Sequence, residues 1–253
     1  MRPFLLRCTL IASMSVAAAG FLGRASEVSG SPDPSVSVHR SDTDAQILSR
    51  YFAAAKQQSE AMRGMTMEVD IDAELPKLKK QGKLHALRNI SKVGKVTYHM
   101  LGFSGDNTIK RDVIARYLTA EVQAQGSQTN LGINPDNYKF KFKGLESTDG
   151  RSVYVFHLTP RHKRVGLFKG ELWLDPDTCM PVRESGRFVK SPSVFFKKMV
   201  FVREYTIADG VAVPHHIESR VDTRIIGPVE LSINFTNPAK TVDAEESAAS
   251  GDE

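Results

Sequence analysis

Cysteine is scarce in this chain of 253 residues, which contains only Cys8 and Cys179. Two cysteines exclude a small scaffold held together by disulfides. Beyond about residue 20 no apolar run approaches the roughly 20 residues that a transmembrane helix needs. The hydrophobic share of 41% and the charged share of 25% also exclude a collagen-like, coiled-coil or wholly disordered chain. The sequence therefore predicts an ordinary globular protein.

Catalytic motifs are also missing. The chain contains no Gly-x-Ser-x-Gly elbow, no phosphate-binding loop, no dinucleotide fingerprint and no His-Glu-x-x-His metal motif. His215 and His216 are adjacent, and on a strand they would point to opposite faces. Cys179 has no neighbouring cysteine, histidine or basic residue that would lower its pKa. We therefore expect no enzyme, no metal site and no cofactor.

The first 25 residues have the three-part pattern of a secretory signal peptide. A short positive beginning precedes an apolar run over residues 8–16, and small residues follow. Cleavage after Ala19 or Ala25 would export the chain to the periplasm and leave Cys179 as its only cysteine. An uncleaved signal anchor is the alternative.

Two further segments lack the periodic apolar residues of a folded element. Residues 26–43 are rich in Ser, Val, Pro and Asp and predict a flexible linker, and residues 241–253 predict a disordered acidic tail. Residues 44–240 form the predicted domain. The stretch between residue 43 and the tail holds 30 Lys and Arg against 21 Asp and Glu, a net charge of about +9. That charge suits an anionic partner or serves only solubility.

Two segments repeat their apolar residues at helical spacing. The first covers residues 44–62, where Thr43 and Gln46 are placed as a capping box, and the second covers residues 108–125. Each has one apolar stripe, which should pack on a sheet.

Most other segments alternate apolar and polar residues with period two, which predicts strands with one buried face. The clearest are residues 65–75, 138–143 and 229–235. Less regular strands are predicted at residues 84–90, 95–103, 152–160, 165–175, 181–189, 196–207 and 213–225. Short turns between them require antiparallel pairing.

The predicted fold is α+β and mainly β. About ten one-sided strands form a sheet too large to stay flat, so it should curl. We expect a large curved antiparallel sheet, an incomplete β-barrel, covered by the two helices. Its concave side is either a cavity for a hydrophobic ligand or a plain packed core, and periodicity alone favours the packed core.

Two stretches of strands and turns carry a family resemblance. Residues 171–178, with the sequence Glu-Leu-Trp-Leu-Asp-Pro-Asp-Thr, precede Pro181-Val182-Arg183, and Glu204-Tyr205 precedes an Asp-Gly turn and Pro214. These stretches resemble the strand-turn-strand signature of bacterial outer-membrane lipoprotein-sorting proteins, the LolA-like family. The order of elements across residues 44–238 agrees. Arg88 lies in a strand suitable for the family's buried lid arginine, but its neighbours do not match closely enough to assign it.

The resemblance implies a periplasmic carrier or binding protein that shields acyl chains of lipoproteins or lipids inside a hydrophobic half-barrel. Shielding is needed because about fifteen methylenes cost on the order of 12 kcal/mol to hold in water. The expected protein is a monomer that exchanges cargo with inner- and outer-membrane donor and acceptor proteins and binds no nucleic acid. The alternative is a non-catalytic envelope sensor or protein-binding module of the same fold.

Two groups of residues are candidates for contact with such a ligand. Exposed basic turns would attract lipid phosphates or an acidic partner, although they are also typical of solvated turns. These turns contain Arg161, Lys163, Arg164, Lys79 and Lys80. The predicted cavity lining is Met65, Met67, Val69, Ile71, Val96, Tyr98, Met100, Phe140, Phe142, Leu172, Leu174, Val229, Leu231 and Ile233.

Overall fold

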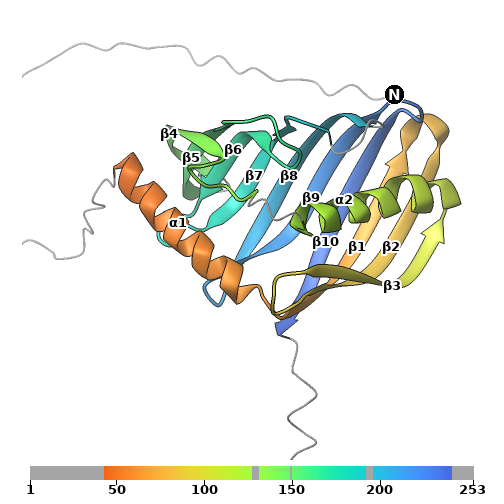
Figure 1. Cartoon of the computed structure of the whole chain (residues 1–253), viewed down its shortest axis with the longest axis horizontal. Coiled ribbons are helices and arrows are strands. Elements are labelled where there is room, and N and C mark those ends of the chain that lie inside the picture. The colour runs from red at the N-terminus through yellow and green to blue at the C-terminus, as the bar shows by residue number, and fades with distance from the viewer. Residues whose placement is uncertain (1–42, 127–130, 149, 192–195, 241–253) are drawn as a thin grey trace, which may run out of the picture. The chain divides into compact units, whose positions relative to one another are not determined.

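Ten strands and two α-helices make up most of the part of the chain that the computed structural model describes, residues 43–126, 131–148, 150–191 and 196–240 (Figure 1). The compact unit that contains them extends from Asp42 to Glu253. The predicted signal peptide, all but the last residue of the predicted linker, and the acidic tail lie outside the described residues. No helix in the described ranges has the length and apolar character needed to cross a membrane.

The elements follow the predicted order of one helix, three strands, one helix and seven strands. The helical elements are α1 (Asp44–Ala61), the 3-10 turn η1 (Pro76–Leu78), the π-helical turn η2 (Ile109–Ile114) and α2 (Ala115–Gly126). The strands are β1 (Met65–Leu75), β2 (Lys80–Ile90), β3 (Val96–Gly105), β4 (Tyr138–Thr148), β5 (Arg151–Pro160), β6 (Phe168–Leu174), β7 (Pro181–Phe188), β8 (Phe196–Ala208), β9 (Val211–Thr223) and β10 (Pro228–Lys240).

The start of α1 is the predicted capping box. The backbone N–H of Gln46 donates to Thr43 Oγ1 at 3.4 Å, and the backbone N–H of Thr43 donates to Gln46 Oε1 at 2.8 Å. These two bonds satisfy donors that a helix start otherwise leaves without partners. Ile47, Tyr51 and Ala54 form the buried stripe of α1.

The second predicted helix begins as η2 and continues as α2 without a break. Ile109, Val113 and Ile114 of η2 are buried against the sheet. Gly82 on β2 makes this contact possible, because a Cβ there would lie 2.8 Å from Ile109 Cγ2. A residue without a side chain in the strand thus lets the helix approach closely.

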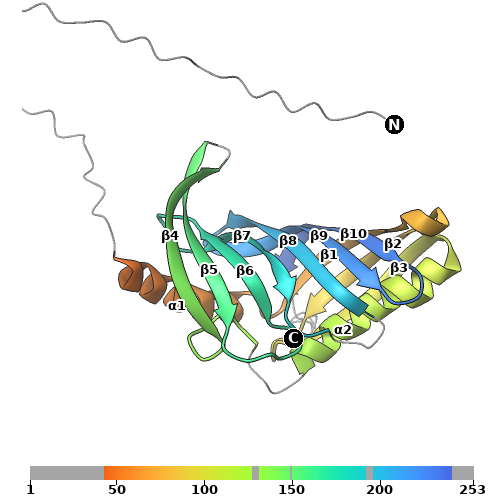
Figure 2. The same ribbon diagram turned by 90° about the horizontal axis from the view of Figure 1, so that it is seen from above.

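All ten strands belong to one antiparallel sheet in the order β3-β2-β1-β10-β9-β8-β7-β6-β5-β4. The sheet curves and does not close, so β3 and β4 are its two free edges. Figure 2 shows α1 and α2 on the same concave side, beneath different halves of the sheet. The predicted large, curved and incomplete barrel is confirmed.

Antiparallel pairing places the connections alternately at the two ends of the strands. The β1–β2, β5–β6, β7–β8 and β9–β10 connections share one end, because β8 starts opposite the end of β9 and β1 ends opposite the start of β10. Both basic turns singled out from the sequence, at residues 79–80 and 161–164, are at this end.

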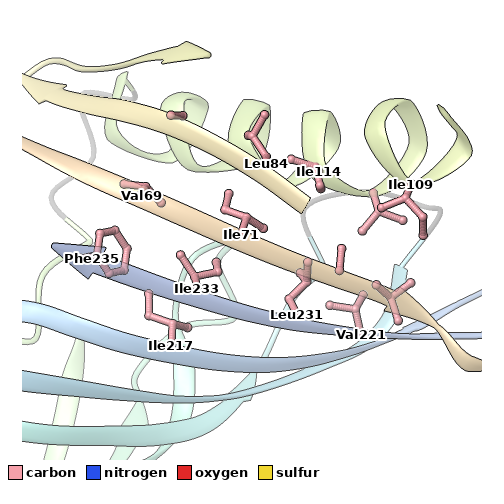
Figure 3. Close-up of a cluster of buried hydrophobic side chains, with 14 of the residues drawn as sticks. Val69, Ile71, Leu84, Ile109, Ile114, Ile217, Val221, Leu231, Ile233 and Phe235 are labelled. Atoms are coloured by element: carbon pink, nitrogen blue, oxygen red, sulfur yellow. The ribbon is translucent and has the colours of Figure 1, made fainter. Parts of the chain in front are cut away.

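The apolar residues gather in two large clusters, one beneath each helix. The first joins β1, β2, β9 and β10 to η2 and α2, and Figure 3 shows Ile71 and Ile233 of this cluster among residues that reach toward Ile109 and Ile114. The second joins α1 to β5 and β6 and includes Ile47, which has no exposed surface. Burying one such aliphatic side chain stabilises the fold by about 1.5–3 kcal/mol.

Candidate ligand-binding groove

An open groove of about 330 Å³ lies between α1, residues 131–133 and strands β6 to β8. We call it the α1 groove. The helix contributes Tyr51, Ala55 and Gln58, and the sheet contributes mostly aromatic side chains. The full lining is Tyr51, Ala55, Gln58, Ser59, Met62, Leu131, Gly132, Ile133, Tyr138, Gly166, Phe168, Pro181, Glu184, Phe188, Phe201, Arg203 and Tyr205.

Aromatic rings in edge-to-face and tilted contact form one wall of the α1 groove. The ring centroid of Phe201 lies 5.0 Å from that of Phe168 and 5.0 Å from that of Phe188. Gly186 leaves the space for this arrangement, because a Cβ there would lie 2.6 Å from Phe168 Cδ2. Burial raises the pKa of Tyr138 to about 12, and its hydroxyl accepts a hydrogen bond from the Phe168 backbone N–H at 3.2 Å. The wall is therefore rigid, apolar and uncharged.

Three polar side chains of neighbouring strands lie together in this groove. Arg203 Nη1 donates to Glu184 Oε2 at 3.2 Å and to the Tyr205 hydroxyl at 3.4 Å. The Tyr205 hydroxyl donates to Glu184 Oε1 at 2.8 Å. Strand pairing accounts for the cluster, because Glu184 on β7 lies directly opposite Arg203 on β8, and Tyr205 follows two residues later on the same face. We call these residues the Arg203 triad.

The Arg203 triad has no net charge, because Arg203 is cationic and Glu184 is its anionic partner. Burial and the Glu184 charge raise the pKa of Tyr205, so its hydroxyl stays protonated. Burial lowers the pKa of Arg203, but Tyr205 and Glu184 raise it by more, so the guanidinium stays charged. Only Nη1 of Arg203 has a hydrogen-bond partner among the described residues. The remaining N–H donors suit an uncharged acceptor such as an ester or amide carbonyl.

Gln58 adds an acceptor to the same groove. Its Nε2 donates to the Ala212 carbonyl at 2.8 Å, whereas its buried Oε1 has no partner within the described ranges. A buried polar atom of this kind is rare in folded proteins. A ligand that carries a hydroxyl or amide N–H would satisfy it.

The concave side beneath α2 is filled. The void there measures only about 20 Å³ and is lined by residues such as Val113, Tyr117 and Leu231. A space of this size holds about one water molecule. The two halves of the concave side thus differ, with a packed core beneath α2 and an open groove beside α1.

A second group of the same three residue types connects α2 to the sheet. Arg88 on β2 donates from Nε to the Tyr98 hydroxyl at 3.1 Å and from Nη2 to Glu121 Oε1 on α2 at 3.2 Å. The Tyr98 hydroxyl donates to Glu121 Oε2 at 2.6 Å. We call these residues the Arg88 triad. Burial and then the Glu121 charge raise the pKa of Tyr98, and the charges of Glu121 and Tyr98 outweigh burial to raise that of Arg88.

The structure places the predicted cavity residues away from the α1 groove, and none of the fourteen lines it. Most of them are buried beneath α2 or α1, Tyr98 belongs to the Arg88 triad, and Met100 is 51% exposed near a free sheet edge. Those in or against the cluster beneath α2 are Met67, Val69, Ile71, Val96, Tyr98, Val229, Leu231 and Ile233. Leu172, Leu174, Phe140 and Phe142 belong to or pack on the cluster beneath α1, and Met65 is buried at the start of β1.

Four of the predicted basic residues are on turns, and Lys80 is the first residue of β2. Arg161, Lys163, Arg164 and Lys79 are exposed, and Lys80 pairs with Asp106 at 3.1 Å. The turn with Arg161 to Arg164 borders the α1 groove, because Gly166, two residues further along the chain, lines the groove. This turn could therefore attract an anionic headgroup at the groove's rim.

Sequence reasoning missed Glu184, Arg203, Tyr205 and Gln58. A signal was present on β8, where Phe201, Arg203 and Tyr205 share one face by period two. A charged residue between aromatic residues on an inward face departs from the usual pattern and indicates a polar site in the interior. Among the described residues, no three His, Cys, Asp or Glu side chains gather as metal ligands would.

No protein-family profile and no curated protein matches this sequence. Solved structures do show similarity. A DUF1329 family protein from Desulfovibrio piger shares 14% identity, with 81% of this chain and 97% of that chain covered and a TM-score of 0.43. A LolA superfamily protein from Nitrosomonas europaea shares 11% identity, with 78% and 96% covered and a TM-score of 0.40.

A chain of the MucA/MucB complex of Pseudomonas aeruginosa is also similar, with 13% identity, 78% and 96% coverage and a TM-score of 0.25. The likeness is one of fold. The LolA-like resemblance expected from the turn motifs thus has a counterpart among solved structures. At these identities and scores the likeness carries no conclusion about the ligand, for which the geometry of the groove is the only guide.

Proposed function

We propose that this chain is a non-catalytic binding protein of the bacterial envelope that holds an acyl chain of a lipid or lipoprotein in the α1 groove. The supporting observation is an aromatic groove that also contains an Arg-Glu-Tyr cluster without net charge, in which the arginine keeps spare N–H donors. Acyl chains in lipids and lipoproteins end in an ester or amide, so the ligand presents an apolar tail beside a carbonyl. The tail packs on Phe168 and Phe201, and the carbonyl accepts from Arg203.

The volume of the groove sets how much of a ligand it takes as it stands. At about 330 Å³ it is at the lower end of the roughly 300–1,000 Å³ typical of ligand pockets. A longer chain requires α1 to move outward. The hydrogen bonds between α1 and the sheet or its turns include those from Arg50 to the Pro176 and Asp177 carbonyls, from Gln58 to the Ala212 carbonyl and from Lys240 to the Ala61 carbonyl, and both Arg50 and Lys240 are exposed. Breaking them leaves no buried charge, so α1 is the helix that yields to cargo.

Filling the groove tests this proposal. In Ala55→Phe a bulky ring enters the groove from α1, and we expect uptake of a fluorescent fatty acid by the unit Asp42–Glu253 to weaken at least about tenfold. Ala53→Phe on the exposed side of the same helix is the matched control and should bind as the parent does. Equal affinities of Ala55→Phe and the parent would contradict the proposal. Native mass spectrometry of gently purified protein should show a bound lipid.

The role of Arg203 has a separate test. The double change Arg203→Gln and Glu184→Gln keeps the site uncharged but removes the guanidinium donors. We expect it to weaken binding of an acyl ester about tenfold, in line with hydrogen bonds from charged groups. Binding of a hydrocarbon dye without a carbonyl should not change. A parallel loss for both ligands would show that Arg203 only shapes the groove.

A second function is favoured by the edge strand β3. Met100 and Leu101 there are 51% and 49% exposed, and an edge strand can pair with a segment of another protein. This arrangement suits an envelope sensor or protein-binding module. Met100→Ser with Leu101→Ser should then abolish partner binding and leave fatty-acid uptake intact. A protein that takes up no lipid, and whose partner binding depends on these two residues, would favour this function over the first.

A further inference from the structure

Two turns of the sheet lie side by side and touch. One joins β1 to β2 over residues 76–79, and the other joins β9 to β10 over residues 224–227. The aliphatic stem of Lys77 crosses Gly227 so closely that a Cβ at Gly227 would be 2.9 Å from Lys77 Cδ. Gly227 also has a positive φ of 87°, which favours glycine. We call this pair of turns the two-turn tip.

Each turn of the two-turn tip presents one large apolar side chain to solvent. Leu78 is 48% exposed and Ile225 is 80% exposed. Both turns are anchored to the core by a nearby residue. Leu75, before the first turn, is fully buried, and Ile226 of the second turn packs on the cluster beneath α2. Thr223 fixes the second turn by donating from Oγ1 to the Gly227 carbonyl at 2.7 Å. The apolar side chains are therefore displayed by a rigid scaffold.

Basic side chains surround these apolar residues. Lys77, Lys79 and Arg224 are exposed on the turns themselves, and Lys197 and Lys198 are exposed at the adjoining start of β8. Two acidic groups at this end have basic neighbours, and the exposed pair Glu74 and Glu230 adjoins the turns on the outer face of the sheet. Lys80 is 3.1 Å from Asp106, and Lys198 is the strand partner of Asp222.

Acidic side chains lie instead on the outer face of the sheet, behind the tip. Asp72, Glu74, Glu218 and Glu230 line a shallow hollow there with Arg220. An anionic surface would therefore attract the tip and repel the outer face, which favours an orientation with the strand ends toward that surface.

We propose that the two-turn tip docks on an anionic lipid bilayer, with Leu78 and Ile225 in the headgroup region and the five basic side chains beside lipid phosphates. Each Lys or Arg near such a surface strengthens binding about fivefold, equivalent to about 1 kcal/mol. A bilayer fits better than a nucleic acid, because the exposed apolar residues are aliphatic and offer no ring for bases to stack on. It also fits better than an acidic protein, because two projecting side chains do not form the packed patch of a protein interface.

Docking brings the carrier of the proposed function to a lipid source, and in that sense the inference rests on the proposed function. The two can fail separately. Ala55→Phe fills the groove from α1, a helix that leads into β1 at the strand end opposite the tip, and should leave vesicle binding unchanged. Loss of vesicle binding in this variant would overturn the inference as stated.

The chain contains its own control site at the opposite strand end. Val93 on the β2–β3 turn is 84% exposed, and exposed Lys92 and Lys95 flank it. This turn therefore also combines an exposed aliphatic side chain with basic neighbours, but it would face away from the bilayer. In the unit Asp42–Glu253 the only natural cysteine is Cys179, which is buried, so introduced cysteines can be labelled selectively.

The first experiment labels Ile225→Cys and Val93→Cys with a polarity-sensitive dye. On vesicles of phosphatidylcholine with about one third phosphatidylglycerol, the dye at position 225 should shift to the blue and gain intensity, whereas the dye at position 93 should not change. Pure phosphatidylcholine vesicles should produce much weaker binding. No shift at position 225, or equal shifts at both positions, would overturn the inference.

The second experiment measures vesicle co-sedimentation of charge variants. The triple change Lys77→Gln, Lys79→Gln and Arg224→Gln should weaken binding to the anionic vesicles by about 100-fold and reduce its dependence on salt. Lys92→Gln with Lys95→Gln should weaken it less than about twofold. Similar losses per charge in both variants would mean that net charge alone causes binding. A parent that binds heparin or an acidic protein but not the vesicles would assign the tip to another kind of partner.

Discussion

The two halves of the concave side differ in how completely a helix fills the space against the sheet. Beneath α2 the apolar faces of strands and helix meet and leave only about 20 Å³, whereas beside α1 they leave a groove of about 330 Å³. Each half contains one arginine, one tyrosine and one glutamate in mutual hydrogen bonds. In the closed half the glutamate is on the helix, so the ion pair fastens α2 to the sheet.

In the open half all three residues are on strands, so this ion pair does not connect α1 to the sheet. The side chain of Arg203 is also far more exposed than that of Arg88, at 35% against 9%. The position of the glutamate thus makes the difference: on a helix it ties the helix to the sheet, and on a strand it leaves the arginine facing an open groove.

The largest effect should come from breaking the Arg88 triad. Arg88→Met leaves Glu121 and Tyr98 without their cationic partner in a buried place, which we expect to lower the free energy of unfolding by about 3–5 kcal/mol. Urea denaturation measures this change, and hydrogen exchange should show faster opening of α2 than of α1. A decrease of less than about 1 kcal/mol in the free energy of unfolding would mean that apolar packing alone keeps α2 on the sheet.

The contrast between filled and open halves can be tested with one substitution made in each. Ala120→Phe forces a ring into the space beneath α2 and should destabilise the fold by about 1–3 kcal/mol through overpacking. Ala55→Phe has the α1 groove to occupy and should change stability by less than about 0.5 kcal/mol. Thermal or urea unfolding compares the two, and equal losses would show that the groove is closed in solution.

Alkaline pH should destabilise the fold through the tyrosines of both triads. The pKa values of Tyr98 and Tyr205 are raised by burial, so above about pH 10 the unfolded chain releases phenol protons that the folded chain retains. The free energy of unfolding therefore falls as pH rises. Between about pH 10 and 11 each tyrosine contributes at most about 1.4 kcal/mol to that fall.

The measurement for this prediction is the slope of unfolding free energy against pH. Tyr98→Phe and Tyr205→Phe should each make the slope shallower than in the parent. If Tyr205→Phe leaves the slope unchanged, Tyr205 titrates normally in the folded chain and water reaches it freely.

Breaking the Arg203 triad should destabilise the fold less than breaking the Arg88 triad. Arg203→Met leaves the 8% exposed side chain of Glu184 without its cation, but Tyr205 still donates to this carboxylate and the space of the partly exposed Arg203 opens to the groove, so we expect a loss of about 2 kcal/mol. A loss as large as that of Arg88→Met would remove the distinction between the two triads. Urea denaturation under identical conditions makes the comparison direct.

Local patterns in the sequence predict the fold well. The alternation over residues 65–75 matches β1 to the residue, and the capping box at Thr43 and Gln46 is present as predicted. These features depend on neighbours within a few residues, which is why the sequence alone reveals them. The antiparallel order follows from short connections in the same way.

The candidate site depends on contacts between distant parts of the chain. Arg88 could not be assigned from its neighbours, and its role becomes visible only when β3 places Tyr98 opposite it and α2 brings Glu121 above it. The fourteen predicted lining residues have in common a largely apolar side chain and a position that alternation places on the inner face. Inward-facing residues can lie beneath a tightly packed helix as well as in a cavity, and periodicity does not distinguish the two.

The pairing of β1 with β10 has a consequence for how the chain folds. Met65 lies opposite Lys240, so the first strand finds one of its two partners only when the last strand has been made. Contacts between such distant residues slow folding, because a long loop must close first. Until then one edge of β1 stays open to pairing with other chains. We therefore expect slow folding with a phase prone to aggregation, and removing β10 should leave β1 to β3 unable to join the rest of the sheet.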